Sequence, residues 1–148
     1  MRVLVATAVG LAALAGCSRA PEEPEVKVQR AAVTLPAVPG RPGAAYFTLK
    51  TNTSPTNLIG VTSPLVQRIE LHDSGTRGGV SRMTPLEETV FPARGILEFK
   101  PGGKHAMLFG IDSSVKPGGT IPLTFTFDPA PAVTVEAEVH APGAFEAH

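Results

Sequence analysis

The chain has 148 residues and a formal net charge of zero, with 13 basic and 13 acidic residues. It contains no basic stripe and no patch of interleaved aromatic and basic residues, which argues against a nucleic-acid partner. Glycine and proline number 15 each and are spread along the chain without long helical periodicity, a pattern typical of short strands joined by turns. Length and composition together predict a single all-β domain between the two termini.

Residues 1–16 have the layout of a secretory signal peptide. One charge, Arg2, precedes an apolar run that is shorter than the roughly 20 residues a membrane-spanning helix needs. The segment Leu14-Ala15-Gly16-Cys17 resembles the cleavage box of bacterial lipoproteins. This resemblance implies that Cys17 is lipidated and becomes the first residue of the mature protein. An ordinary signal peptide with an incidental cysteine and a buried N-terminal strand are the alternatives.

Cys17 is the only cysteine, so the folded domain has no thiol for a disulfide or for redox chemistry. We expect a protein that faces the periplasm and contacts the membrane through its lipid anchor only. Residues 17–25 are polar and contain proline, which is typical of a flexible tether. The domain should then occupy residues 26–140, followed by a loose tail over residues 141–148.

The domain is predicted to consist of strands, several of which alternate between apolar and polar residues. In Ile121–Phe127, every second residue from Ile121 is apolar and the intervening positions are Pro122 and threonines, as a sheet packed on one side requires. About eight or nine such strands predict a β-sandwich or Greek-key barrel. The predicted strands are Val26–Leu35, Ala45–Lys50, Leu58–Thr62, Val66–His72, Gly79–Thr84, Gly95–Phe99, His105–Ile111, Ile121–Phe127 and Val133–Val139.

Two methionines remain after removal of the signal peptide, and each has a histidine nearby. His105 and Met107 lie on one predicted strand and point to the same face, about 6.6 Å apart. His72 ends one strand and Met83 lies on the next, across a glycine-rich segment. If these two strands pair as a hairpin, His72 and Met83 come together at one end of the domain.

A set of two histidines and two methionines favours a soft, monovalent ion. Thioether sulfur is soft and uncharged, so it selects Cu(I), whereas zinc prefers thiolates or additional imidazole and carboxylate ligands. One Cu(I) with four neutral ligands keeps a charge of about +1, which favours a position at the edge of the protein because charge is costly to bury. A blue-copper electron-transfer site is excluded, since it needs a cysteine thiolate.

The spacing His72, Met83, His105, Met107 resembles the motif of the PCuAC family of periplasmic copper chaperones. The flanking sequences are similar as well, notably residues 82–87 (RMTPLE), 100–107 (KPGGKHAM) and 39–46 (PGRPGAAY). The resemblance covers residues 26–140. It implies a cupredoxin-like Greek-key sandwich that binds one Cu(I) through these four residues, and a role in supplying copper to the CuA centre of cytochrome c oxidase.

Two acidic residues lie near His72 in the sequence. Asp73 is either a carboxylate that orients His72 or an exposed turn residue, and Glu70 is interpreted as a solvated strand-face charge. Some family members end in a tail rich in histidine and methionine, whereas this chain offers only His140 and His148, so a second copper site is not expected.

Three functions are compatible with these observations. The first is a monomeric copper chaperone with a copper donor and a copper-accepting envelope protein, such as an oxidase subunit or its assembly factors. The second is a copper-buffering or resistance lipoprotein without a specific recipient. The third is a structural β-sandwich lipoprotein in which histidine and methionine are incidental. No motif for a catalytic triad, paired carboxylates or a phosphate-binding loop is present, so an enzyme is not expected.

Overall fold

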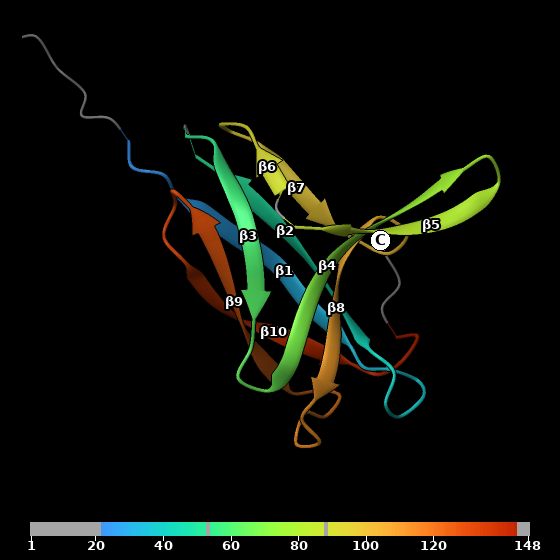
Figure 1. Ribbon diagram of the computed structural model, residues 1–148. Coiled ribbons are helices and arrows are strands. Elements are labelled where there is room, and N and C mark those ends of the chain that lie inside the picture. Colours follow the sequence, from blue (N-terminus) through green and yellow to red (C-terminus); the bar gives the residue numbers. More distant parts are fainter. Residues whose placement is uncertain (1–21, 53, 88, 145–148) are drawn as a thin grey trace, which may run out of the picture.

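The computed structural model describes residues 22–144 apart from positions 53 and 88, and this part of the chain contains only strands and connecting segments. No helix that could cross a membrane occurs within these residues. Cys17, the signal peptide and His148 lie outside them. The strands, labelled in Figure 1, are β1 (Val26–Thr34), β2 (Gly43–Thr51), β3 (Thr56–Thr62), β4 (Val66–Arg77), β5 (Val80–Leu86), β6 (Thr89–Phe91), β7 (Ile96–Phe99), β8 (Lys104–Ile111), β9 (Thr120–Asp128) and β10 (Val133–His140).

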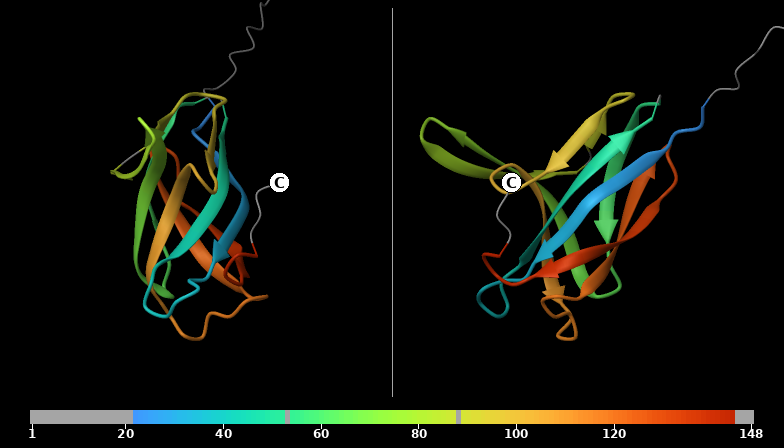
Figure 2. Two further views of the ribbon diagram at one scale, coloured as in Figure 1. Left: turned by 90° about the vertical axis from the view of Figure 1, so that its right-hand side faces the viewer. Right: turned by 180° about the vertical axis from the view of Figure 1, so that it is seen from behind.

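All ten strands belong to one sheet, in the order β5-β4-β8-β2-β1-β10-β9-β3-β6, with β7 paired to another part of β2. The sheet curls onto itself. Phe47 of β2 contacts Phe125 of β9 edge to face at 4.7 Å between ring centres, although β1 and β10 separate these strands in the sheet. Figure 2 shows the resulting layers from two further directions. The predicted all-β, sandwich-like fold is confirmed.

The core follows from the alternation seen in the sequence. On β9, Ile121, Leu123 and Phe125 are completely buried while Thr126 between the aromatic residues is exposed. Phe47 also stacks on Phe99 of β7, with ring centres 4.3 Å apart. Aromatic pairs of this kind contribute roughly 0.5–1.5 kcal/mol beyond their area burial, so the phenylalanines join the layers of the sheet.

Two features of the fold differ from the sequence-based expectation. The structure has ten strands rather than eight or nine, because β6 has only three residues and is too short to show alternation. Strand β4 continues to Arg77, beyond its predicted end at His72. Gly78 and Gly79 alone form the turn, with φ values of 61° and 78° that glycine adopts without steric cost. The long β4–β5 hairpin is therefore regular almost to its tip.

Phe47→Ala should lower the free energy of unfolding by about 3–5 kcal/mol, because it removes a fully buried ring that contacts both Phe99 and Phe125. Urea denaturation of the domain would measure the change. Val90→Ala is the control, since Val90 on β6 is 68% exposed and its truncation should change stability by no more than about 0.5 kcal/mol. Equal effects of the two substitutions would contradict the assignment of the core.

Candidate metal centre

Two histidines face each other across the ladder that joins β4 and β8. His72 is the direct partner of His105 in the antiparallel register, and their ring centres lie 6.0 Å apart. The preceding pair in the register, Leu71 and Ala106, is buried in the core. Since successive residues of a strand point to opposite faces, both histidines project from the other face of the sheet. The spacing leaves room for one ion between the rings, because a metal–imidazole bond is about 2 Å long.

Both methionines lie on this same face. Met107 follows His105 by two residues, and Met83 of β5 is opposite Ser74, which follows His72 by two residues. Each methionine is thus a diagonal neighbour of His72, at a Cα spacing of about 7–8 Å that long side chains can bridge. Met83 is 52% exposed, whereas Met107 is half-buried. The hairpin needed to bring Met83 near His72 is present, and three adjacent strands supply the four residues.

The hydrogen bond of His105 determines which ring nitrogen is available. His105 Nδ1 lies 2.9 Å from the Gly103 carbonyl oxygen. A carbonyl only accepts hydrogen bonds, so Nδ1 carries the proton in the neutral ring and Nε2 keeps its lone pair. Such a backbone bond to one nitrogen is how proteins commonly orient a metal-binding histidine. His105 Nε2 is therefore the nitrogen that can bind a metal.

His72 has the opposite arrangement. Its Nε2 lies 3.2 Å from Glu70 Oε2, and a carboxylate likewise only accepts, so Nε2 carries the proton. Its Nδ1 is buried and has no hydrogen-bond partner among the described residues. A buried polar atom without a partner costs about 1–3 kcal/mol, and an unfilled ligand position is one of the recognised explanations. The lone pair of His72 Nδ1 thus fits a metal ligand.

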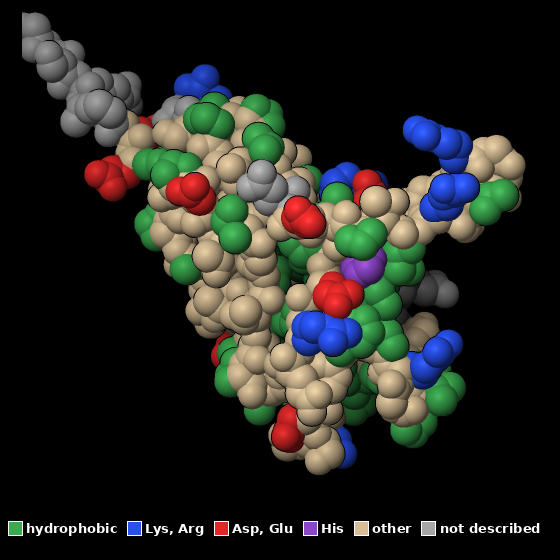
Figure 3. Space-filling model, viewed as in Figure 1, with side chains coloured by type: hydrophobic (Ala, Val, Ile, Leu, Met, Phe, Trp, Pro, Cys, Tyr) green, Lys and Arg blue, Asp and Glu red, His purple; other side chains and the backbone are tan. Residues whose placement is uncertain are grey.

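Glu70 is a strand-face charge whose side chain is 41% exposed, and it also has a structural partner on either side. Its second oxygen, Oε1, lies 2.7 Å from Arg68 Nε, and the Arg68 guanidinium lies 4.3 Å from the centre of the Phe109 ring. Figure 3 shows a histidine at the surface beside an acidic and a basic side chain. Arg68, Glu70 and His72 alternate along β4, so their common face could have been recognised from period-two spacing.

The remaining candidates lie elsewhere. Asp73 projects from the face opposite to His72, and its Oδ2 lies 3.2 Å from Lys104 Nζ, so the structure does not bring it together with His72. His140 ends β10, which β1 and β2 separate from β8, and its Nε2 lies 3.6 Å from Glu138 Oε2.

One further residue belongs to this face. Tyr46 follows the buried Ala45, which pairs with Ala106, so Tyr46 lies at the position next to His105. Partial burial raises the pKa of the Tyr46 phenol, which keeps it neutral at physiological pH. The adjacent Tyr46 and Phe47 point to opposite faces, and only the register shows that Phe47 is the one in the core. A neutral phenol at this position adds no charge to the site.

The donor set is poor in charged ligands. Within the part of the chain that the structure describes, no group of three or more histidine, cysteine, aspartate or glutamate side chains could hold a metal ion. Zinc and calcium sites are usually built from such groups. Met83 and Met107 are the uncharged sulfur donors on the face that carries His72 and His105.

The fold is that of a PCuAC domain. The copper-bound PCuAC domain of PmoF2 superimposes with a TM-score of 0.66 at 23% identity, over 79% of this chain and 93% of that one. Apo-DR1885 from Deinococcus radiodurans matches with a TM-score of 0.60 at 27% identity, over 97% of this chain and 98% of its own. The Cu(I) form of DR1885 gives a TM-score of 0.53 at 29% identity, over 85% and 83%.

The chain belongs to the LpqE-like family, whose model, described as "Putative lipoprotein LpqE-like", matches residues 26–139. Among curated relatives, a "Putative lipoprotein" of Leifsonia xyli subsp. xyli is 31% identical over 86 residues, which is 57% of this chain and 52% of the relative. An uncharacterized protein of Rickettsia prowazekii is 31% identical over 87 residues, 57% of this chain and 48% of the relative. The match thus spans about half the length of these relatives.

In their neutral form, the two histidines should show opposite tautomers in the metal-free protein. Long-range ¹H–¹⁵N NMR should find the proton of His72 on Nε2 and that of His105 on Nδ1, because of their Glu70 and Gly103 partners. Glu70→Ala should shift His72 towards a mixture of tautomers and leave His105 unchanged. Glu98→Ala, on the exposed face of β7, is the control and should change neither ring. Identical tautomers in the wild type would contradict the assignment.

Proposed function

We propose that this protein is a copper(I) carrier of the bacterial cell envelope that holds one ion with His72, Met83, His105 and Met107. The observation that carries the proposal is the His72–His105 pair, in which one nitrogen of each ring is held by a protein acceptor and the other keeps a free lone pair. The thioethers of Met83 on β5 and Met107 on β8 lie at diagonal positions to His72, on the two strands that flank β4.

The chemistry of this set matches Cu(I) better than other common ions. Two neutral imidazoles and two thioethers bring no negative charge, so a divalent ion would remain poorly compensated, whereas thioether sulfur selects soft Cu(I). The site carries about +1 when loaded and therefore favours contact with solvent. Met83 is 52% exposed, which gives the site an open side. The names of the similar structures, "Copper-bound PCuAC domain from PmoF2" and "CuI-DR1885", are in line with this cargo.

Release would proceed by ligand exchange. A sulfur or imidazole of the recipient would approach from the exposed side and replace the thioethers, which are the weaker ligands. Met83 would leave first, because it lies on the terminal strand of the sheet, whereas Met107 is held between β4 and β2. The histidines would retain the ion until the recipient completes its own coordination. In this scheme the protein transfers an ion and catalyses no covalent reaction.

We further propose that lipidation at Cys17 anchors the carrier to the periplasmic side of a membrane and that its recipient is a cuproenzyme such as the CuA centre of cytochrome c oxidase. The family and its Leifsonia relative both have "lipoprotein" in their names, which supports the anchor. The choice of the oxidase as the recipient rests on the resemblance of residues 26–140 to PCuAC chaperones.

A Cu(I) titration against a colorimetric chelator under reducing conditions should show tight one-to-one binding by the domain. The Met83→Ala/Met107→Ala variant should bind on the order of 100-fold more weakly, a loss of about 2.8 kcal/mol. His140→Ala is the matched control and should retain wild-type affinity, because β10 is remote from the site. Circular dichroism should show that all three proteins remain folded without copper. Equal binding by the wild type and the double variant would refute the proposed ligand set.

Deletion of the protein should lower oxidase activity when copper is scarce if it delivers copper to a specific recipient. A buffering lipoprotein would instead matter only when copper is in excess. Growth and oxidase activity of the deletion strain, measured at low and high copper, distinguish these outcomes, and complementation with the Met83→Ala/Met107→Ala variant should fail in either case. A phenotype restricted to high copper would favour the buffering function over delivery.

A further inference from the structure

The distal part of β4 and the whole of β5 form a two-stranded arm, residues 73–86, that projects from the sandwich (Figures 1 and 2). Strand β5 is the last strand at this end of the sheet, and its residues from Val80 to Pro85 are all exposed. A two-stranded ribbon is only marginally stable in water. This arm nevertheless carries Met83, one of the proposed copper ligands, on the face shared with His72.

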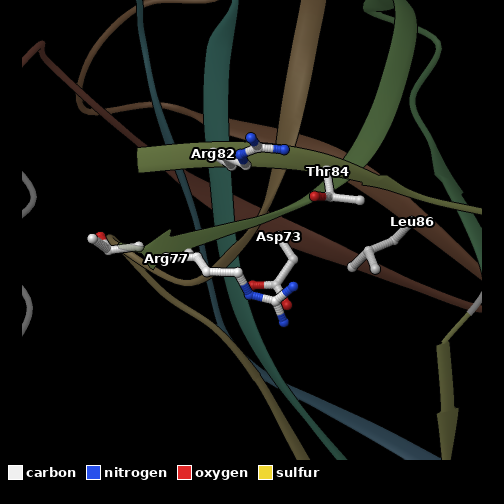
Figure 4. Close-up of a pocket in the computed structure, with 7 residues that line it drawn as sticks. Asp73, Arg77, Arg82, Thr84 and Leu86 are labelled. Carbon is white, nitrogen blue, oxygen red and sulfur yellow. The ribbon is translucent and has the colours of Figure 1, made fainter. Parts of the chain in front are cut away.

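The face of the arm opposite to Met83 is hollowed into a groove of about 520 Å³. Its lining follows from the register, in which Asp73 pairs with Thr84 and Gly75 pairs with Arg82. These four positions therefore lie on one face of the ribbon. Figure 4 shows five of the lining residues, with Arg82, Thr84 and Leu86 on one strand and Asp73 and Arg77 on the other. The groove is lined by Asp73, Gly75, Arg77, Arg82, Thr84 and Leu86, among others.

The groove has an excess of positive charge. Residues 74–82 include Arg77 and Arg82 and no acidic residue. Neither arginine forms an ion pair with a described residue, and Asp73 is neutralised by Lys104 at 3.2 Å. Arg77 and Arg82 occupy diagonal positions on the same face of the ladder. Figure 3 shows basic side chains on the arm. The groove thus holds two arginines and one carboxylate, Asp73, which already has Lys104 as its ion-pair partner.

We propose that this arm groove is a docking surface for an acidic segment of the protein that exchanges copper with this carrier. Guanidinium groups bind carboxylates through paired hydrogen bonds, and the groove volume suits a few residues of an extended peptide. A segment bound there lies across the two-stranded ribbon from Met83. Because β5 is the last strand at this end of the sheet, the partner can reach the copper site around its open edge. The identity of the partner as a copper protein rests on the proposed function, whereas recognition of an acidic segment does not.

A protein segment fits this surface better than an anionic membrane. Membrane-binding polybasic segments usually contain about 4–8 lysines and arginines, whereas the arm offers only two unpaired cations. The groove also contains the Asp73 carboxylate and the Thr84 hydroxyl. The carboxylate would repel a phosphate-rich surface, whereas both groups can form hydrogen bonds with the amide groups of a peptide.

The test uses the metal-free domain and a fluorescently labelled peptide with four consecutive glutamates, beside the same peptide with glutamines. Fluorescence anisotropy should show binding of the glutamate peptide that weakens as salt is added. Arg77→Glu/Arg82→Glu should reduce the affinity at least tenfold. The matched control Arg41→Glu/Lys116→Glu reverses two exposed cations outside the arm and should leave binding unchanged. Both variants should retain wild-type Cu(I) affinity in the chelator titration, which separates this inference from the proposed function.

Gly75→Val provides a second test that does not alter charge. No atom lies within 4 Å of a Cβ added at Gly75, so valine should fit the strand and occupy the groove. It should weaken peptide binding while the protein stays folded. The inference is overturned by no binding of the glutamate peptide at low salt, or by equal effects of the arm and control reversals. Binding to phosphatidylglycerol vesicles that the arm reversal abolishes, without peptide binding, would assign the arm to the membrane instead.

Discussion

The antiparallel pairing of β4 with β8 is the constraint on which the candidate site depends. Its register places His72 opposite His105, and the buried pair Leu71 and Ala106 holds that register from the other face. A slip of one residue would turn both sets of side chains over, with imidazoles in the core and alkyl groups in water. The hydrophobic core and the histidine pair therefore both follow from the same register. Burial of the apolar side chains is what stabilises this register.

Much of this arrangement could be predicted because period-two alternation is a local property. Each of the nine predicted strands corresponds to a strand of the structure, and the alternation of Ile121–Phe127 gave the correct buried face. The pairing of β4, which carries His72, with β5, which carries Met83, could be expected from the glycines between the two strands. Strand β6 was missed because three residues show no period, and the end of β4 was placed too early because Gly75 suggested a turn where the strand simply continues.

The polar surroundings of the histidines were harder to predict, because they depend on which side chains meet across strands. Asp73 is adjacent to His72 in sequence yet points to the opposite face, whereas Glu70, two residues away, is the one that holds the ring. Tyr46 comes from β2, and its position beside His105 requires the whole strand order β4-β8-β2. Partners distant in sequence leave no local pattern, so only the assembled sheet reveals them.

The phenylalanine cluster that joins the layers of the sheet lies apart from the four candidate ligands. None of those candidate ligands holds the layers together, so the fold of the sandwich does not rest on a bound ion. Proteins whose metal builds the fold lose their structure when the metal leaves and become substrates for proteases. If the proposed carrier function holds, a scaffold that stands without its cargo avoids that fate, and one molecule serves through many successive cycles of loading and unloading.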